Sequence, residues 1–419
     1  MNFFDLIPSF IASLCIVAAE NTGGLHGASG NMFHVDHSAR RFELLKETEY
    51  DPKTEIGKSR FTVHWEETTE IIQVTEPADF TGVPAPSMAE FYGLDATNVR
   101  AANAGEAFVA RVALVVTGAT KLEPSVRDRP SFIGPFTPDK LPGSRSGTIM
   151  LNAVPVPVSL AKNHAKITHC QPIDATALES GFWRVVLEGA QRDGRFVASR
   201  MQVSPLPDPR MTDDPRLPRV LVIGDSISMN YHEAAKTALH GVANYHRNDG
   251  NAFSSSHGVN NTELWLGNFR QQGLHWDVIQ FNHGLHDLKQ AYDRETDTFG
   301  AYAVPIERFQ ANLEQQIAIL KQTGATLIWC STTPIPNDIK SQYSRRKGAE
   351  ILYNQAALEV MRRHPEILVN DLHGVVANSP VYDRWRTTKD VHFYATDEQK
   401  TLGEAVASVV KQALKNRNK

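Results

Sequence analysis

The chain has 419 residues, 41% apolar and 21% charged, with a formal net charge of -4. This length exceeds the usual size of one domain, and the apolar content can fill at least one sizeable core, so we expect two domains. The mild charge, with acidic and basic residues interspersed, excludes the basic footprint of a nucleic-acid-binding protein and predicts a neutral or small partner.

The chain begins with MNFFDLIPSFIASLCIVAAEN, an apolar stretch of signal-peptide length that ends in Val-Ala-Ala before Glu20. Asp5 and the lack of Lys or Arg at its start are unlike a secretory signal. Residues 1–31 are therefore a candidate leader, and a secreted or periplasmic location and a cytoplasmic one both stay open. No apolar run reaches 18 residues, so we expect no membrane-spanning helix.

Residues 32–205 are predicted to form a β-rich accessory domain, a sandwich or a small barrel. FTVHWEETTEIIQV, EAFVARVALVVTG and GFWRVVLEGAQRDGRFVASRMQV alternate or run apolar at strand lengths, with Gly, Asp and Pro at the breaks. Trp65 and Trp183 lie in these predicted strands, which favours core packing over stacking on a sugar. The three cysteines, Cys15, Cys170 and Cys330, lack the spacing of a zinc site or a disulfide framework.

The stretch SPLPDPRMTDDPRLPR has five prolines in sixteen residues, which predicts a stiff linker over residues 206–218. After it, apolar strands alternate with amphipathic helices to the end of the chain. Repeated strand-helix units predict that residues 219–419 form a mostly parallel sheet covered by helices on both faces.

The run VLVIGDSIS, residues 220–228, joins a buried-type strand to small and polar residues. Parallel sheets place their chemistry at the carboxyl ends of their strands. Gly224 permits a tight departure from the strand, and Ser226 would begin a helix whose dipole favours nearby negative charge. Ser226 is therefore a candidate nucleophile, with an ordinary turn or helix cap as the alternative.

Three motifs together resemble the SGNH or GDSL hydrolase family over residues 218–415, about half of the chain. They are Gly224-Asp225-Ser226 after a strand, a Gly-x-x-Asp after a later strand, and an Asp and a His near the carboxyl terminus. The resemblance implies a flavodoxin-like three-layer α/β/α domain and a serine esterase. In it Ser226 is the nucleophile and His392 the general base, with an acyl-enzyme intermediate and neither metal nor organic cofactor.

The acid of this triad departs from the family spacing of Asp-x-x-His. Lys389 stands three residues before His392, and Asp390 stands two before it. We assign Asp390 as the acid, because its task is to orient the imidazole and stabilise the imidazolium. A Ser-His dyad, or Asp383 as a substitute, stays an alternative.

The oxyanion hole departs from the family as well. Where the family has Gly-x-Asn-Asp, the chain has Gly-Leu-His-Asp at 284–287, so His286 is the expected donor, with an activity that depends on its charge state, and Asn282 is the alternative. His283 and His286 also form His-x-x-His, but no third ligand is spaced with them, so we predict no metal. Asp287 is expected to hold the loop.

The family's Asn-Ala-x-x-Ser-Gly motif corresponds to the start of NAFSSSHGVNNTELW, which places Ser256 at the glycine. Because the oxyanion donor there is a main-chain N–H, serine can supply it beside the Ser226 amide. Gly258 is the competing position, and a plain Ser-rich loop is the bland interpretation.

The substrate is predicted by analogy, since an accessory β-domain is a common companion of carbohydrate-active esterases. We expect a polysaccharide or small-molecule ester, most simply a carbohydrate O-acetyl ester, with Trp385 lining the pocket. A lipase or short-chain acyl esterase, with an apolar patch from Trp265, Leu266 and Phe269, and a non-catalytic carbohydrate-binding protein are the alternatives. The oligomeric state is left open.

Overall fold

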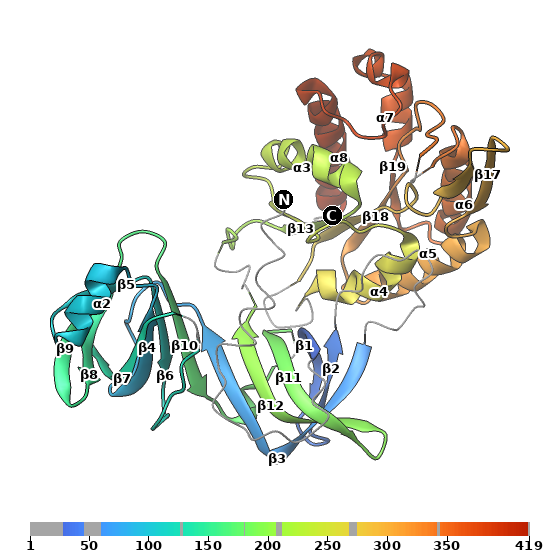
Figure 1. Cartoon of the computed structure of the whole chain (residues 1–419). Coiled ribbons are helices and arrows are strands. Elements are labelled where there is room, and N and C mark those ends of the chain that lie inside the picture. Colours follow the sequence, from blue (N-terminus) through green and yellow to red (C-terminus); the bar gives the residue numbers. More distant parts are fainter. Residues whose placement is uncertain are drawn as a thin grey trace. The chain divides into compact units, whose positions relative to one another are not determined.

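The computed structural model describes residues 28–45, 60–125, 129–179, 181–206, 212–267, 275–341 and 344–417 (Figure 1). Contacts divide the chain into two compact units, one of residues 1–44 and 61–207 and the other of residues 45–60 and 208–419. The boundary after residue 207 falls within the predicted linker.

The N-terminal unit is built mainly of strands joined in one sheet of order β12-β11-β1-β2-β3-β10-β6-β4-β7-β8-β9-β5. β12 also pairs with β3, so β12, β11, β1, β2 and β3 close into a ring. The elements are β1 (Ala28–Asp36), β2 (Arg41–Leu45), β3 (Arg60–Thr75), β4 (Ser87–Tyr92), α2 (Ala96–Asn103), β5 (Phe108–Ala110), β6 (Val112–Val116), β7 (Ser131–Pro138), β8 (Ser146–Leu151), β9 (Val154–Leu160), β10 (Lys166–Pro172), η1 (Ala175–Ala177), β11 (Trp183–Arg192) and β12 (Arg195–Pro205).

Three hydrophobic clusters lie among the described residues of this unit. One lies inside the ring and includes Trp65, which is buried, while Trp183 packs against it half-buried. A second gathers Phe91, Phe108 and Phe136 among β4 to β9, and a smaller third lies where β3, β6 and β10 pair. Strand periodicity alone does not reveal which strands share a core, so the prediction of a β-rich domain over residues 32–205 could not give these clusters.

Two sequence boundaries need correction. β1 begins at Ala28, so residues 28–31 of the candidate leader are part of a strand, while residues 1–27, with Cys15, lie outside the described residues. The end of the predicted linker is held on the C-terminal unit, because the Asn244 side chain donates to the carbonyls of Asp214 and Leu217 at 2.9 and 3.1 Å. Cys170 and Cys330 are buried.

The C-terminal unit has a five-stranded sheet of order β14-β13-β15-β18-β19, and each pairing is parallel. Its strands are β13 (Arg219–Ile223), β14 (Asn244–Arg247), β15 (Val278–Phe281), β18 (Thr326–Cys330) and β19 (Leu368–Asn370). Numbered along the chain, this is the order 2-1-3-4-5 of flavodoxin-like sheets, whose direction of winding reverses beside β13. The carboxyl ends of β13 and β15 flank that switch point.

Helices cover both faces of this sheet (Figure 1). α3 (Ser226–Ala238), α8 (Thr396–Arg417) and α7 (Leu372–Asn378) pack together, and α4 (Ser255–Leu266), α5 (Ile306–Lys321) and α6 (Ala349–Arg362) form the other layer. The expected three-layer arrangement is therefore present. The unit also contains a hairpin, β16 (Gln290–Asp293) with β17 (Thr298–Tyr302), and the short helices η3 (Pro380–Tyr382) and η4 (Trp385–Thr387).

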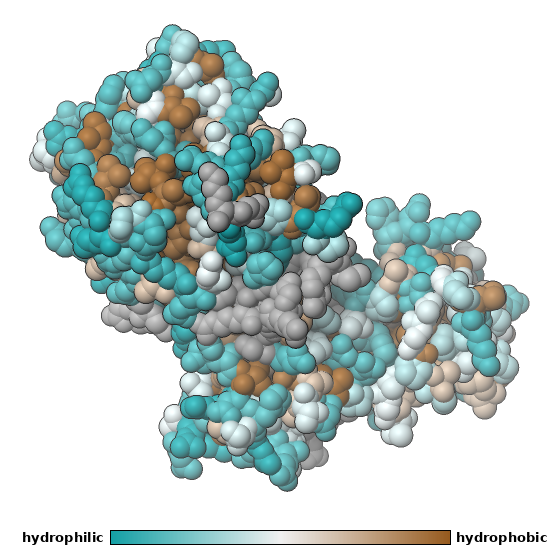
Figure 2. All heavy atoms as spheres, turned by 180° about the vertical axis from the view of Figure 1, so that it is seen from behind, coloured by the Kyte–Doolittle hydropathy of each residue, from teal (hydrophilic) through white to brown (hydrophobic). Residues whose placement is uncertain are grey.

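Within the part of the chain described, no helix combines the length and apolarity needed to cross a membrane. Figure 2 shows hydrophobic residues on the visible face of the C-terminal unit as separate groups among hydrophilic ones.

Candidate active site

Ser226 lies at the point where β13 leaves the sheet and α3 begins. All five residues of β13 are buried, and Asp225 caps the helix by accepting the Ile227 N–H at 2.9 Å. The turn needs glycine, because a Cβ on Gly224 would lie 2.8 Å from the Ser228 Cβ. The helix begins at Ser226, as the sequence predicted, and so directs its N-terminal amides toward this edge.

His392 lies in the short segment between η4 and α8. The segment is fixed on three sides: Trp385 Nε1 donates to the His392 carbonyl at 3.1 Å, Gln399 donates to the Phe393 carbonyl at 2.8 Å, and the Phe393 N–H donates to Asn230 Oδ1 at 3.1 Å. Asn230 stands one turn after Ser226 on α3. This last bond ties the histidine segment to the helix that carries the serine.

Four side chains form a continuous hydrogen-bonded row. Ser226 Oγ lies 2.9 Å from His392 Nε2, and His392 Nδ1 lies 2.7 Å from Asp390 Oδ1. Tyr394 donates its hydroxyl to Asp390 Oδ2 at 2.7 Å. The side chains of His392 and Asp390 are 33% and 45% exposed, so solvent reaches the row. The structure thus brings together the three residues that the sequence assigned to nucleophile, base and acid.

The charge of Asp390 is maintained by its neighbours. Burial would raise its pKa, but hydrogen bonds from the Tyr394 hydroxyl and the His392 backbone outweigh that effect and hold the pKa below its ordinary value. The alternative acid, Asp383, is exposed and pairs instead with Arg386. Asp390 is therefore the carboxylate that the geometry offers to His392.

The Ser-rich stretch is a helix start, not a plain loop. Ser254 caps α4, and the Ser255 N–H donates to Asp287 Oδ1 at 2.9 Å. Burial raises the pKa of Asp287 to about 7, against the Ser255 hydrogen bonds that lower it. The predicted role of Asp287 in holding the loop fits these contacts.

The Ser256 amide is the unused donor of that first turn. The N–H groups of Ser255, His257 and Gly258 all have partners, whereas no residue that the structure describes accepts from the Ser256 N–H. Its hydroxyl is turned to Asn312, whose amide donates to it at 3.0 Å. A free amide at a helix N-terminus is suited to receive negative charge.

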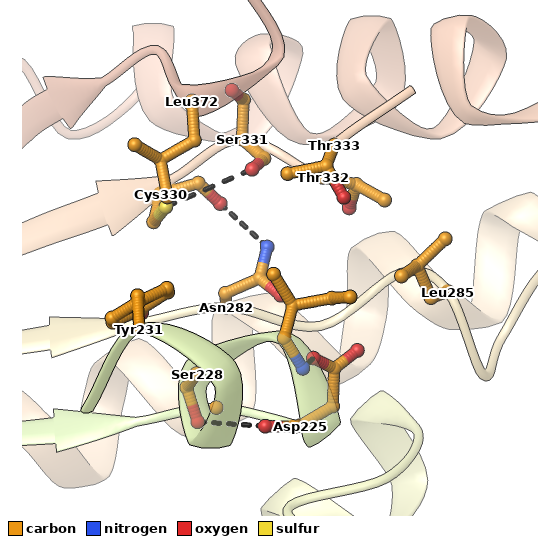
Figure 3. Close-up of a pocket in the computed structure, with 12 residues that line it drawn as sticks. Asp225, Ser228, Tyr231, Asn282, Leu285, Cys330, Ser331, Thr332, Thr333 and Leu372 are labelled. Carbon is orange, nitrogen blue, oxygen red and sulfur yellow. Dashed lines mark hydrogen bonds between the residues drawn. The ribbon is translucent and has the colours of Figure 1, made fainter. Parts of the chain in front are cut away.

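Gly258 and Asn282, the alternative oxyanion donors, make structural contacts. A Cβ on Gly258 would lie 2.3 Å from His283 Nε2, so this glycine serves helix packing, and its N–H bonds to the Ser254 carbonyl inside α4. Asn282 donates to the Cys330 carbonyl at 2.7 Å and joins the ends of β15 and β18 (Figure 3). These contacts use the Gly258 N–H and the Asn282 side-chain amide, the two groups that the sequence offered as alternative oxyanion donors.

Trp385 is also corrected. It is buried, its ring stacks on Phe393 at a centroid distance of 4.7 Å, and its N–H is used on the His392 carbonyl. It packs under the histidine segment and does not line a pocket.

The sequence also offered an apolar surface patch for a lipid substrate, formed by Trp265, Leu266 and Phe269. Trp265 and Leu266 are buried and so form no such patch, and Phe269 lies outside the described residues.

The two histidines after β15 are both buried and uncharged. His283 Nδ1 contacts the Phe253 carbonyl and Nε2 contacts Gln316, and burial lowers its pKa to about 4. His286 Nδ1 lies 2.9 Å from Lys289 Nζ, and burial, with Lys289 and Arg345, lowers its pKa well below the ordinary value. The expectation that the charge state of His286 controls activity does not fit this burial.

A small cavity lies between the ends of β13, β15 and β18 (Figure 3). Asp225, Asn282 and Thr333 are among its lining residues. Asp225 Oδ2 and Thr333 Oγ1 have no hydrogen-bond partner among the residues described, which suits a polar cavity that holds water. In the same described portion, no group of three or more His, Cys, Asp or Glu side chains could hold a metal ion.

Tyr394 is the member of the row that sequence analysis missed. The signal was present as the alternation Asp-x-His-x-Tyr at 390–394, in which polar residues alternate with apolar ones. Val391 and Phe393, the residues between them, are buried.

The sequence matches no model of a protein family, and no curated protein matches it. Solved structures similar to this one include a GDSL-like lipase from Bacteroides thetaiotaomicron, at 15% identity, a TM-score of 0.34 and coverage of 47% of this chain and 88% of that one. The C-terminal catalytic domain of a peptidoglycan O-acetyltransferase from Streptococcus pneumoniae is 16% identical, with a TM-score of 0.32 and coverage of 48% and 95%. A variant of an acetyl-xylooligosaccharide esterase from Geobacillus is 15% identical, with a TM-score of 0.33 and coverage of 46% and 93%.

Proposed function

We propose that the C-terminal unit is a serine esterase that hydrolyses acyl esters through an acyl-enzyme. The observation that carries the proposal is the separation of 2.9 Å between Ser226 Oγ and His392 Nε2, with Asp390 on the other ring nitrogen. A hydroxyl, an imidazole and a carboxylate in this order are the arrangement that activates a serine.

The chemistry follows from the row. Ser226 Oγ attacks the ester carbonyl carbon while its proton passes to His392 Nε2, and the carbonyl electrons move onto the oxygen. Collapse breaks the bond to the alcohol, which leaves with the proton from His392. Water then gives a proton to His392 as its oxygen attacks the acyl carbon. Collapse breaks the bond between that carbon and Ser226 Oγ, which takes the proton back from His392, and the carboxylic acid leaves. Asp390 stabilises the imidazolium at both stages.

Three donors are proposed for the oxyanion: the main-chain N–H groups of Ser226 and Ser256 and the ring of His286. The free Ser256 amide supports the second. The third is supported by Lys289. Burial lowers the pKa of Lys289 only to about 8, so this side chain is an ammonium at neutral pH and donates to His286 Nδ1. The proton of the neutral imidazole is then on Nε2. Losing one such donor typically costs about a hundred- to a thousandfold in turnover.

Within this activity we propose a carbohydrate O-acetyl ester as the substrate. Tyr394 is 72% exposed, and its ring centroid lies 6.2 Å from that of His392. An exposed aromatic face beside His392 is a platform on which a sugar ring can stack while its acetyl group enters the site. The burial of Trp265 and Leu266 removes the observation that favoured a lipid substrate.

The first experiment compares wild type with Ser226→Ala on p-nitrophenyl acetate. Ser199→Ala is the matched control, since it removes an exposed serine hydroxyl that bonds to the Glu188 carbonyl in the other unit. We expect hydrolysis by wild type and the control and none by Ser226→Ala, with a fluorophosphonate labelling Ser226 only in the first two. Equal inertness of all three proteins on acetyl and longer acyl esters would instead support a binding function.

The substrate class is tested separately, by acetate release from acetylated xylan, pectin and chitin fragments. Wild type should release acetate from at least one of them with a higher kcat/KM than from p-nitrophenyl acetate. Tyr394→Ala should raise KM for that fragment more than for the small ester. Turnover of p-nitrophenyl esters without any release from these fragments would reject the carbohydrate substrate and retain the esterase.

A further inference from the structure

The segment that carries His392 alternates between a buried and an accessible side. Val391 and Phe393 are 2% and 0% exposed, whereas Asp390, His392 and Tyr394 meet on the accessible side. The chain bends at Val391, and the His392 N–H donates to Asp390 Oδ1 at 3.1 Å, so an acid two residues before the histidine reaches its ring.

Both oxygens of Asp390 are occupied. Oδ1 accepts from the His392 N–H at 3.1 Å and lies 2.7 Å from His392 Nδ1, and Oδ2 accepts the Tyr394 hydroxyl at 2.7 Å. With a side chain 45% exposed, this carboxylate stands where water competes for its oxygens. Without the hydroxyl, rotation of the carboxylate and exchange with water would weaken the bond to Nδ1.

Resting on the proposed esterase function, we propose that Tyr394 is a positioning residue of the reaction. Its hydroxyl fixes the Asp390 carboxylate with Oδ1 toward His392 Nδ1, so that the acid is already oriented when the imidazolium forms. Tyr394 keeps its proton throughout, because the hydrogen bond to Asp390, with burial, raises the pKa of its phenol above the ordinary value. The gain comes from preorganisation, since the donor and the acceptor need not move during the reaction.

The test uses Tyr394→Phe, which removes the hydroxyl and keeps the ring. Tyr292→Phe is the matched control, because Tyr292 also donates its hydroxyl to a carboxylate, that of Asp297, in the β16–β17 hairpin. For both variants and wild type, kcat and KM on p-nitrophenyl acetate are measured from about pH 5 to 9, together with the thermal unfolding midpoint.

We expect Tyr394→Phe to lower kcat about three- to tenfold with KM within about twofold, as for one lost hydrogen bond to a partly exposed charge. The acidic limb of its kcat/KM profile should move to lower pH, because a less firmly oriented Asp390 carboxylate stabilises the imidazolium form of His392 less. Tyr292→Phe should match wild type in both measurements.

A wild-type kcat and pH profile in Tyr394→Phe would overturn the proposal, whether or not the unfolding midpoint falls, since a merely structural tyrosine would move only the midpoint. This outcome differs from failure of the esterase function itself. In that case wild type and Ser226→Ala would be equally inert, and the proposal would fall with the function.

Discussion

Replacement of Asp390 by asparagine tests which carboxylate completes the triad. Asparagine keeps an oxygen that can accept from His392 Nδ1, so the change removes the charge more than the geometry. At the separation of 2.7 Å between Nδ1 and Oδ1, two unit charges attract by about 1.5 kcal/mol in water and about 6 kcal/mol at an effective dielectric constant of 20. Because the Asp390 side chain is 45% exposed, we take the lower part of this range, about 2–3 kcal/mol.

If Asp390→Asn removes about 2–3 kcal/mol of stabilisation from the His392 imidazolium in the transition state, kcat should fall about 30- to 150-fold. The assay uses p-nitrophenyl acetate near neutral pH. Asp383→Asn is the matched control, since Asp383 is the exposed acid that pairs with Arg386. We expect it to retain wild-type kcat. Full activity of Asp390→Asn together with loss in Asp383→Asn would refute the assignment, and full activity in both would favour a Ser-His dyad.

Three further predictions concern the residues around the row. Gly224→Ala brings a Cβ to 2.8 Å from Ser228 and should lower the free energy of unfolding by about 1–3 kcal/mol, measured by denaturant titration; an unchanged midpoint would contradict the need for glycine. His286→Asn should keep kcat within about tenfold of wild type and leave the pH profile unchanged, because the low pKa of His286 keeps its ring neutral; a profile that flattens would show that the ring titrates. Between about pH 6.5 and 4, His283 binds a proton in the unfolded chain but not in the folded one. As the pH is lowered through this range, the free energy of unfolding should therefore fall by about 1.4 kcal/mol per pH unit because of His283. His283→Gln should remove that part of the pH dependence, and an unaltered pH dependence would refute the assignment.

The C-terminal fold was predictable because its signals are local and repeated. The apolar run before Gly224 and the alternation of strands with amphipathic helices indicate a parallel sheet, and the structure has that sheet with Ser226 at its switch point. The start of α4 was harder, because consecutive serines also suit a loop, and the decisive contact is the one that Asp287 makes to Ser255 from another segment.

Side-chain fates in the site could not be predicted, since they depend on contacts between distant segments. Trp385 looked like a pocket residue from its nearness to His392 in sequence, yet it packs under the histidine segment against Phe393. Gly258 looked like a backbone donor, yet its task is to leave room for His283, which follows a different strand. Sequence pattern gives the periodicity of an element but not the element that faces it.

The acid spacing at Asp390 and the histidine at position 286 are two points at which the sequence differs from the SGNH pattern that it resembles. They share a structural feature that helps to choose between catalysis and a purely binding function. Where the acid stands at Asp-x-His instead of Asp-x-x-His, Tyr394 supplies a donor to the free oxygen of Asp390. Where histidine replaces asparagine, the Lys289 ammonium donates to the inner nitrogen of His286 and leaves the outer nitrogen as a donor. An oriented acid and an N–H donor are the two groups that the proposed hydrolysis requires at these positions. The compensation at both therefore favours a working esterase, and hydrolysis that depends on Ser226 is the result on which this inference stands or falls.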